Sequence, residues 1–159
     1  MKALSHQFEP VFDDTSRILI LGTFPSVKSR EINFYYGHPQ NRFWKVLAAL
    51  TNESIPASID EKKSLLLRHH IAIWDVIQSC EIQGSSDASI RNVIANDISL
   101  ITSQAPITHI YANGAKAYEL FMRYCENPRQ LPVSKLPSTS PANAACSLDR
   151  LIQEWRCIL

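Results

Sequence analysis

Arg17-Ile18-Leu19-Ile20-Leu21-Gly22 is a run of four large apolar residues that follows a charged residue and ends in glycine. Four such side chains in a row leave no polar face, which is typical of a strand covered on both sides in a parallel sheet. Three further short apolar segments, at 71–76, 107–112 and 130–136, also predict strands. Pro132 lies in the last of them, and because proline cannot donate to a sheet ladder, we expect this strand at an edge.

Helices are expected between these strands. Asp60 is predicted to cap one helix that ends near 68–70. Apolar side chains recur at helical spacing in four other segments: 41–51, 89–104, 114–124 and 147–157. Residues 1–16 are expected as an ordered lead-in. Strands that alternate with helices imply right-handed crossovers, so the predicted fold is a three-layer α/β/α sandwich with a central four-stranded parallel sheet, in a single domain over 1–159.

Composition and charge indicate an ordinary soluble domain. The 159 residues are 45% apolar and 19% charged. The net charge of +1 argues against a histone-like DNA binder, but phosphate binding depends on clustering, so a local basic face stays open. The four scattered cysteines argue against a zinc site, an iron–sulfur cluster or a disulfide framework. Because no signal peptide or membrane span is recognised, we expect a cytoplasmic protein. We also expect it to be a monomer without metal or other cofactor.

Several unusual segments follow the predicted strands and fall on one edge of the sheet. They are the loop after Gly22, the stretch 35–44, Asp75 and the loop 136–143. Ligands of parallel sheets bind outside the carboxyl ends of the strands, so this edge is the expected site. The stretch 35–44 holds four aromatic residues, an amide and a guanidinium, and two readings are open. It is either a packed loop in which Asn41 caps the next helix, or a pocket that stacks a flat ring.

Three motifs along the chain point to a known family. They are Gly22-Thr23-Phe24-Pro25-Ser26, His38-Pro39-Gln40-Asn41-Arg42-Phe43-Trp44 and Leu136-Pro137-Ser138-Thr139-Ser140-Pro141-Ala142-Asn143. They resemble the paired motifs of the uracil-DNA glycosylase superfamily, and the set most resembles the DNA-deoxyinosine (hypoxanthine-DNA) glycosylase family. The segments 73–76 and 84–87 fit the same family, so the resemblance spans nearly the whole chain. Phosphate-loop, dinucleotide and hydrolase-elbow motifs are absent.

The resemblance implies a base-binding pocket. A DNA glycosylase must take its base out of the stack and hold it tightly. Tyr36 stands where the family stacks an aromatic ring on the flipped base, and the backbone of Gly22, Thr23 and Phe24 is expected to bond the base edge. Asp75 is expected either to read a donor on the base or to make a structural hydrogen bond to neighbouring loop amides.

Asn41 is the predicted catalytic residue, by likeness to the asparagine of the second motif. Cleavage of an N-glycosidic bond passes through an oxocarbenium-like sugar, so a fixed amide that orients water or contacts the leaving base suffices. Elsewhere in the superfamily a water-activating Asp or Asn precedes the proline of the first motif. Here that residue is Phe24, which puts uracil excision of the common type in doubt and shifts the chemistry to Asn41.

The third motif and nearby basic residues are the predicted DNA-contacting part. In the family this loop presses on the minor groove, and hydroxyl groups near a helix start suit phosphate. The alternatives are an ordinary loop before a helix and solvated surface charges. The predicted DNA-binding residues are Ser138, Thr139, Ser140, Pro141, Asn143, Lys28 and Arg42.

The resemblance therefore implies an enzyme of base excision repair. It would flip a deaminated base, chiefly hypoxanthine, out of damaged DNA, hydrolyse its glycosidic bond and leave an abasic site. Nothing in the sequence marks Lys28 as an activated amine, so a monofunctional enzyme is expected rather than a lyase. The alternatives are a uracil- or mismatch-specific glycosylase and a non-catalytic α/β module that binds a nucleotide or another ligand.

Overall fold

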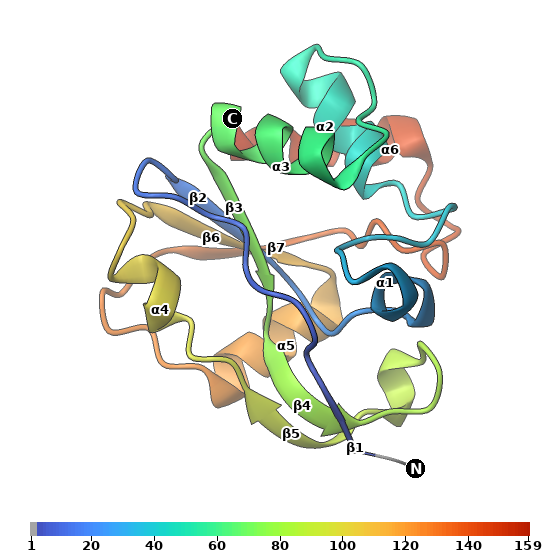
Figure 1. The fold of residues 1–159 in the computed structure, drawn as a ribbon, viewed down its shortest axis with the longest axis vertical. Coiled ribbons are helices and arrows are strands. Elements are labelled where there is room, and N and C mark those ends of the chain that lie inside the picture. The colour runs from blue at the N-terminus through green and yellow to red at the C-terminus, as the bar shows by residue number, and fades with distance from the viewer. Residues whose placement is uncertain (1–2) are drawn as a thin grey trace.

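A parallel four-stranded sheet forms the centre of the protein, whose computed structural model describes residues 3–159 (Figure 1). Its order is β3-β2-β6-β7. The strands are β2 (Ile18–Gly22), β3 (Ile71–Asp75), β6 (His109–Asn113) and β7 (Val133–Leu136). All three pairings are parallel, and β7 lies at an edge, which confirms the four predicted strands and the edge position inferred from Pro132.

Helices cover both faces of this sheet, so the predicted three-layer arrangement is confirmed (Figure 1). One layer holds α2 (Phe43–Thr51), α3 (Ile59–Arg68) and α6 (Leu148–Trp155), which is followed by the short turn η2 (Arg156–Ile158). The other layer holds α4 (Ser99–Thr102) and α5 (Ala115–Tyr124). The short α1 (Val27–Ile32) lies in the loop after β2. No helix among residues 3–159 is long and apolar enough to span a membrane.

The long helix predicted over 89–104 is wrong. That segment instead contains the end of η1 (Asp87–Ser89), then β5 (Arg91–Ala95) and α4. β5 pairs with β4 (Ile77–Glu81), which also pairs with β1 (Ala3–Ser5), in a second, antiparallel sheet of order β1-β4-β5. Ile94, expected to point inward, is 58% exposed. β-branched residues at helical spacing also suit a strand, and pairing with β4 makes this segment a strand rather than a helix.

One helix start is corrected, and the ordered lead-in is confirmed for residues 3–16. The N-cap of α3 is Ser58 rather than Asp60, because the Ser58 hydroxyl accepts from the Glu61 N–H while the Glu61 carboxylate accepts from the Ser58 N–H. The lead-in contains the strand β1, and Val11 forms a bridge to Ile73. The N-terminal segment is therefore part of the folded body.

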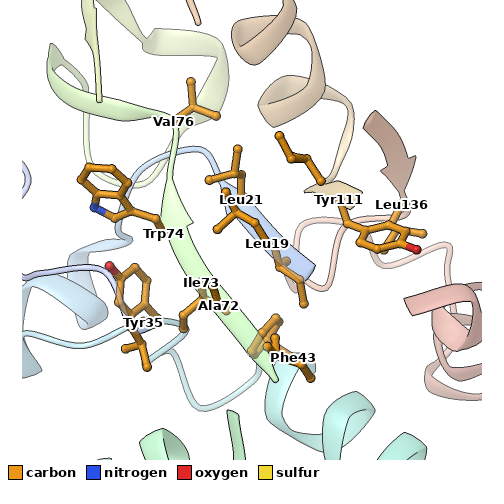
Figure 2. Packing of buried hydrophobic residues seen from close by; sticks show 14 of the residues in the cluster. Leu19, Leu21, Tyr35, Phe43, Ala72, Ile73, Trp74, Val76, Tyr111 and Leu136 are labelled. Carbon is orange, nitrogen blue, oxygen red and sulfur yellow. The ribbon is translucent and has the colours of Figure 1, made fainter. Parts of the chain in front are cut away.

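The core lies between the sheet and its helices, and part of the 35–44 stretch belongs to it. Figure 2 shows Tyr35 and Phe43 packed beside the side chains of β2 and β3. Tyr35 is 2% exposed and Phe43 is fully buried. Trp44 is buried too, and its indole N–H donates to the Tyr35 carbonyl. The packing reading of the stretch therefore holds for these three residues, which leaves Tyr36 and Asn41 to be placed.

Candidate active site

A cavity of about 300 Å³ opens at the carboxyl ends of the parallel strands. It lies at the edge predicted from sequence. Nine of the predicted site residues line it: Gly22, Thr23, Phe24, Tyr36, Asn41, Asp75, Ser138, Thr139 and Ser140. The predicted residues outside its lining are Pro141, Asn143, Lys28 and Arg42. Asn113 and Asp87, for which no role was predicted, also line it.

Gly22 allows the Asp75 carboxylate and the Tyr36 hydroxyl to approach the end of β2 at the cavity floor. A Cβ atom at this position would lie 2.4 Å from Asp75 Oδ1 and 3.0 Å from the Tyr36 hydroxyl oxygen. Both contacts are closer than real Cβ atoms accept without a shift, so only glycine lets the carboxylate and the phenol approach the strand end. The carbonyl oxygens of Gly22 and Thr23 accept from the N–H groups of Val76 and Ile77.

Tyr36 presents an aromatic ring with an unused hydroxyl group. Its backbone is left-handed, with φ 52°, and its ring stacks on Phe43 at a centroid distance of 3.9 Å and an angle of 18°. The buried hydroxyl makes no hydrogen bond of normal geometry within residues 3–159. Burial, and then the charge of Asp75, raise its pKa, and the nearby Asn113 amide offsets this only in part. The group is therefore a neutral hydrogen-bond donor held near the cavity floor.

Asn41 lines the cavity and bonds the first residue of α2, although the N-cap residue of that helix is Arg42 and not Asn41. Its Oδ1 accepts from the Phe43 N–H at 2.9 Å, at the start of α2. Because that partner is a donor, the side-chain orientation is assigned, and the amide NH₂ is the group that no residue of 3–159 binds. The Asn41 oxygen thus serves the start of the helix, and the NH₂ is available to a ligand.

Asp75 ends β3 inside the protein and pairs with a residue that sequence reasoning missed. Its Oδ2 lies 2.8 Å from His6 Nε2, and the two side chains are 5% and 4% exposed. The expected alternative, a hydrogen bond from loop amides to the carboxylate, is not formed among residues 3–159. The Asn96 amide instead donates to the Asp75 main-chain carbonyl. No local signal marks His6, because the pair is separated by 69 residues in the chain.

Asn113 is a second residue that sequence reasoning missed, and it joins the third motif to the sheet. Its Nδ2 donates to Thr139 Oγ1, and its Oδ1 accepts from the Thr139 N–H, both at 3.0 Å. Next to it, Gly114 has φ 98°, and a Cβ there would lie 3.1 Å from Ser138 Cβ. A polar residue at the carboxyl end of a predicted strand was the available sequence signal for Asn113, as it was for Asp75.

Arg42 holds the loop 138–146 through its main chain. The guanidinium donates to four carbonyl oxygens, those of Thr139, Ser140, Asn143 and Cys146. Four acceptors engage most of the five N–H donors of an arginine. The contacts therefore assign Arg42 a positioning task inside the protein, and its contact with DNA stays a prediction.

The polar side chains of the third motif are bonded largely within the loop. The Ser138 and Ser140 hydroxyls accept from the N–H groups of Ser140 and Ala142. The Asn143 amide donates to the Ser138 carbonyl. These bonds give the loop a defined shape while the serine O–H groups remain available as donors.

Besides Asp75, the charged residues Lys28 and Asp87 lie near the cavity and in its lining, respectively. Lys28 on α1 pairs with Glu31 at 3.4 Å, and both side chains are about half exposed. Desolvation raises the pKa of the Asp87 carboxyl, and Lys116 opposes that shift. Within residues 3–159 no cluster of three or more His, Cys, Asp or Glu side chains suited to a metal ion is found.

Known proteins match this chain over most of its length. The model of the uracil DNA glycosylase superfamily matches residues 9–156. A protein of Methanosarcina acetivorans named hypoxanthine DNA glycosylase is 35% identical over 155 residues, which cover 95% of each chain. A Methanosarcina barkeri protein of the same name is 33% identical over 120 residues, 73% of this chain and 76% of the other. The solution NMR structure of an M. acetivorans protein with the provisional name uracil DNA glycosylase superposes with a TM-score of 0.80 at 33% identity, covering 95% of this chain and 93% of that one.

Proposed function

The chain belongs to the uracil DNA glycosylase superfamily, and on that premise we propose that it is a monofunctional DNA glycosylase that excises deaminated bases, chiefly hypoxanthine, from DNA. The observation that carries the proposal is the cavity at the strand ends, where unused donors and an acceptor surround a space of about 300 Å³. An enzyme that acts on a base must extrude it into such a pocket.

Hypoxanthine suits the polar groups of this cavity. Deamination of adenine leaves a ring N1–H next to a carbonyl oxygen, so the base offers a donor beside an acceptor. Asp75 supplies the acceptor for N1–H, and the main-chain N–H of Phe24, which no acceptor among residues 3–159 engages, supplies a donor for the carbonyl. Tyr36 supplies a ring for stacking, a contact worth roughly 1–3 kcal/mol per base.

Asn41 acts on the bond that breaks. The oxygen of a water molecule bonds to C1′ as the C1′–N9 bond breaks, and the electron pair of that bond leaves with the base. The proton released by the water restores the neutral base, so the products are free hypoxanthine and an abasic sugar. Because the Asn41 oxygen is engaged by Phe43, its NH₂ group donates, either to the leaving base or to the oxygen of the attacking water.

Hydrolysis rather than lyase chemistry follows from the residues at the cavity. Among residues 3–159 no lysine belongs to its lining, and Lys28 lies outside it and pairs with Glu31. We propose that Lys28, Pro141 and the serine hydroxyls of the third motif face the DNA backbone. We also propose that the enzyme is a cytoplasmic monomer that needs no metal or other cofactor, since a positioned amide and water suffice for this reaction.

An oligonucleotide assay tests the function. Duplexes that carry one deoxyinosine, one deoxyuridine or one deoxyxanthosine are incubated with the protein, and abasic sites are then cleaved with alkali. We expect strand breaks with deoxyinosine, and breaks that need alkali. Breaks with uracil alone would favour the uracil-specific alternative, and intact strands with all three would leave only a non-catalytic binding module. Light scattering after size exclusion tests the monomer.

A further inference from the structure

His6 lies behind the cavity, where it bonds the lining residue Asp75, although it precedes residue 9, where the match to the family model begins. We propose that His6 is a positioning residue that holds the Asp75 carboxylate turned so that Oδ1 accepts the ring N–H of a deaminated base. This inference rests on the proposed glycosylase function. It assigns to the N-terminal segment the selection of bases that carry a ring N–H.

The pairing explains how a carboxylate is kept inside the protein. Asp75 is buried, and burial of a carboxylate without a hydrogen-bond partner costs free energy. His6 Nε2, at 2.8 Å from Oδ2, supplies the one side-chain hydrogen bond that the carboxylate receives within residues 3–159. The His6 backbone is fixed as well, because its N–H donates to the Gln78 carbonyl at 2.6 Å.

The surroundings of the imidazole select its tautomer. His6 Nδ1 is buried without a partner in residues 3–159, and the rings of Phe8, Tyr35 and Phe24 lie 4.6, 5.8 and 6.2 Å from the His6 ring. An unpaired N–H is tolerated less well inside a protein than an unpaired lone pair. The tautomer with the proton on Nε2 therefore leaves no buried ring N–H unpaired, and its N–H donates to Asp75 Oδ2.

The arrangement leaves one carboxylate oxygen for a ligand. Oδ2 is engaged by His6, whereas Oδ1 lies over Gly22 at the cavity floor. An ionised carboxylate only accepts hydrogen bonds, so it binds the N1–H of hypoxanthine and is repelled by the N1 lone pair of adenine. A site built around such a bond rejects analogues that lack the donor far more strongly than an apolar site does. His6 would thus contribute to the rejection of undamaged adenine.

Two substitutions at His6 separate this role from simple packing. His6→Gln keeps an N–H donor at nearly the position of Nε2, whereas His6→Leu fills the space among the aromatic rings without a donor. His6→Phe, which matches the ring shape, replaces His6→Leu if the latter does not fold. His109→Leu is the matched control, because it removes an imidazole that bonds only Ser134 within residues 3–159.

The measurements are single-turnover excision of hypoxanthine and affinity for two uncleavable duplexes. These carry 2′-fluoro nucleotides of hypoxanthine or of unsubstituted purine, which lacks N1–H and adds no bulk. We expect wild type to prefer the hypoxanthine duplex by about 10-fold or more, as for a hydrogen bond to a charged group. His6→Leu should lose this preference and slow excision by about 10- to 100-fold. His6→Gln and His109→Leu should keep the preference.

The outcomes separate this inference from the proposed function. A wild type that excises no hypoxanthine overturns both. A wild type that excises hypoxanthine, together with a folded His6→Leu that keeps the preference for hypoxanthine over purine, overturns only the role of His6. A folded His6→Gln that behaves like His6→Leu does the same. In an Asp75→Asn background, His6→Leu should have little further effect, since the imidazole acts through the carboxylate.

Discussion

The two walls of the cavity differ in how their polar groups are used. On the wall built from the first two motifs and β3, the Asn41 NH₂, Asp75 Oδ1 and the Tyr36 hydroxyl have no hydrogen-bond partner within residues 3–159. On the wall built from the third motif, Thr139 is bonded twice to Asn113, and Arg42 is bonded to four carbonyls. Unused polar groups are available to a substrate, whereas satisfied ones hold a shape.

This difference implies a division of tasks. The first wall would carry the chemistry and read the base, and the second would present a firm surface to the DNA. Substitutions in the first wall should therefore change turnover more than stability. Those in the second should change stability and DNA binding together.

The largest effect is expected for Asn41. Asn41→Ala should slow single-turnover excision by about 100- to 1000-fold, as for the loss of one positioned donor. It should also lower stability by about 1 kcal/mol, because the Phe43 N–H loses its acceptor. Asn41→Asp is the control, since it keeps an acceptor for the Phe43 N–H but has no NH₂; it should be stable and equally slow. Wild-type turnover by either variant would contradict the assigned role.

Tyr36 should come next. Tyr36→Ala removes the ring that we expect to stack on the base and should weaken handling of lesion DNA by about 5- to 150-fold, with a smaller loss for undamaged duplex. Tyr36→Phe keeps the ring and removes a buried hydroxyl that no protein group satisfies, so its thermal stability should equal or exceed that of wild type. Equal losses of affinity for lesion and undamaged duplex in Tyr36→Ala would mean that the ring is only structural.

Arg42 tests the second wall. Arg42→Ala leaves four carbonyls without their donor and should lower the free energy of unfolding by about 1–3 kcal/mol, measured by denaturant titration. Arg42→Lys should recover only part of this loss, because an ammonium cannot reproduce the planar fork. DNA affinity should fall with stability. Lost affinity at unchanged stability would instead indicate direct contact with phosphate.

The smallest effect is expected for Lys28. Its ammonium is exposed and pairs with Glu31, so Lys28→Ala should leave stability nearly unchanged. If it faces the DNA backbone, the slope of affinity against salt concentration should fall by about one unit, with little change in excision at saturating enzyme. An unchanged slope would place Lys28 outside the DNA face.

Much of the fold could be predicted because its signals are local. The four parallel strands are short apolar runs, and the helices α2, α5 and α6 show periodic apolar faces. The antiparallel sheet could not be predicted in this way. β5 has the β-branched residues of a strand at positions that also fit a helix, and only its pairing with β4 settles the matter.

The candidate site divides in the same manner. The order of the motifs, together with the rule that ligands bind at the carboxyl ends of parallel strands, predicted one shared site. Nine of the predicted residues do line one cavity. Neither the motif order nor this rule could show that the Asn41 oxygen accepts from the Phe43 N–H, that Arg42 donates to carbonyls about 100 residues away, or that Asp75 bonds His6. Hydrogen-bond partners that are distant in sequence come together only through the tertiary fold, so local sequence patterns do not predict them.

Patterns of neighbouring residues are enough to predict the parallel sheet, the edge at which we expect a ligand and the residue types gathered there. Periodicity and turn chemistry are properties of neighbouring residues, so they can be read along the chain. Which atom of each polar side chain is left for a substrate depends on the folded protein. Burial turns every unpaired polar atom into a cost, and the partners that remove that cost for Asn41, Asp75 and Thr139 are known only once the chain is folded.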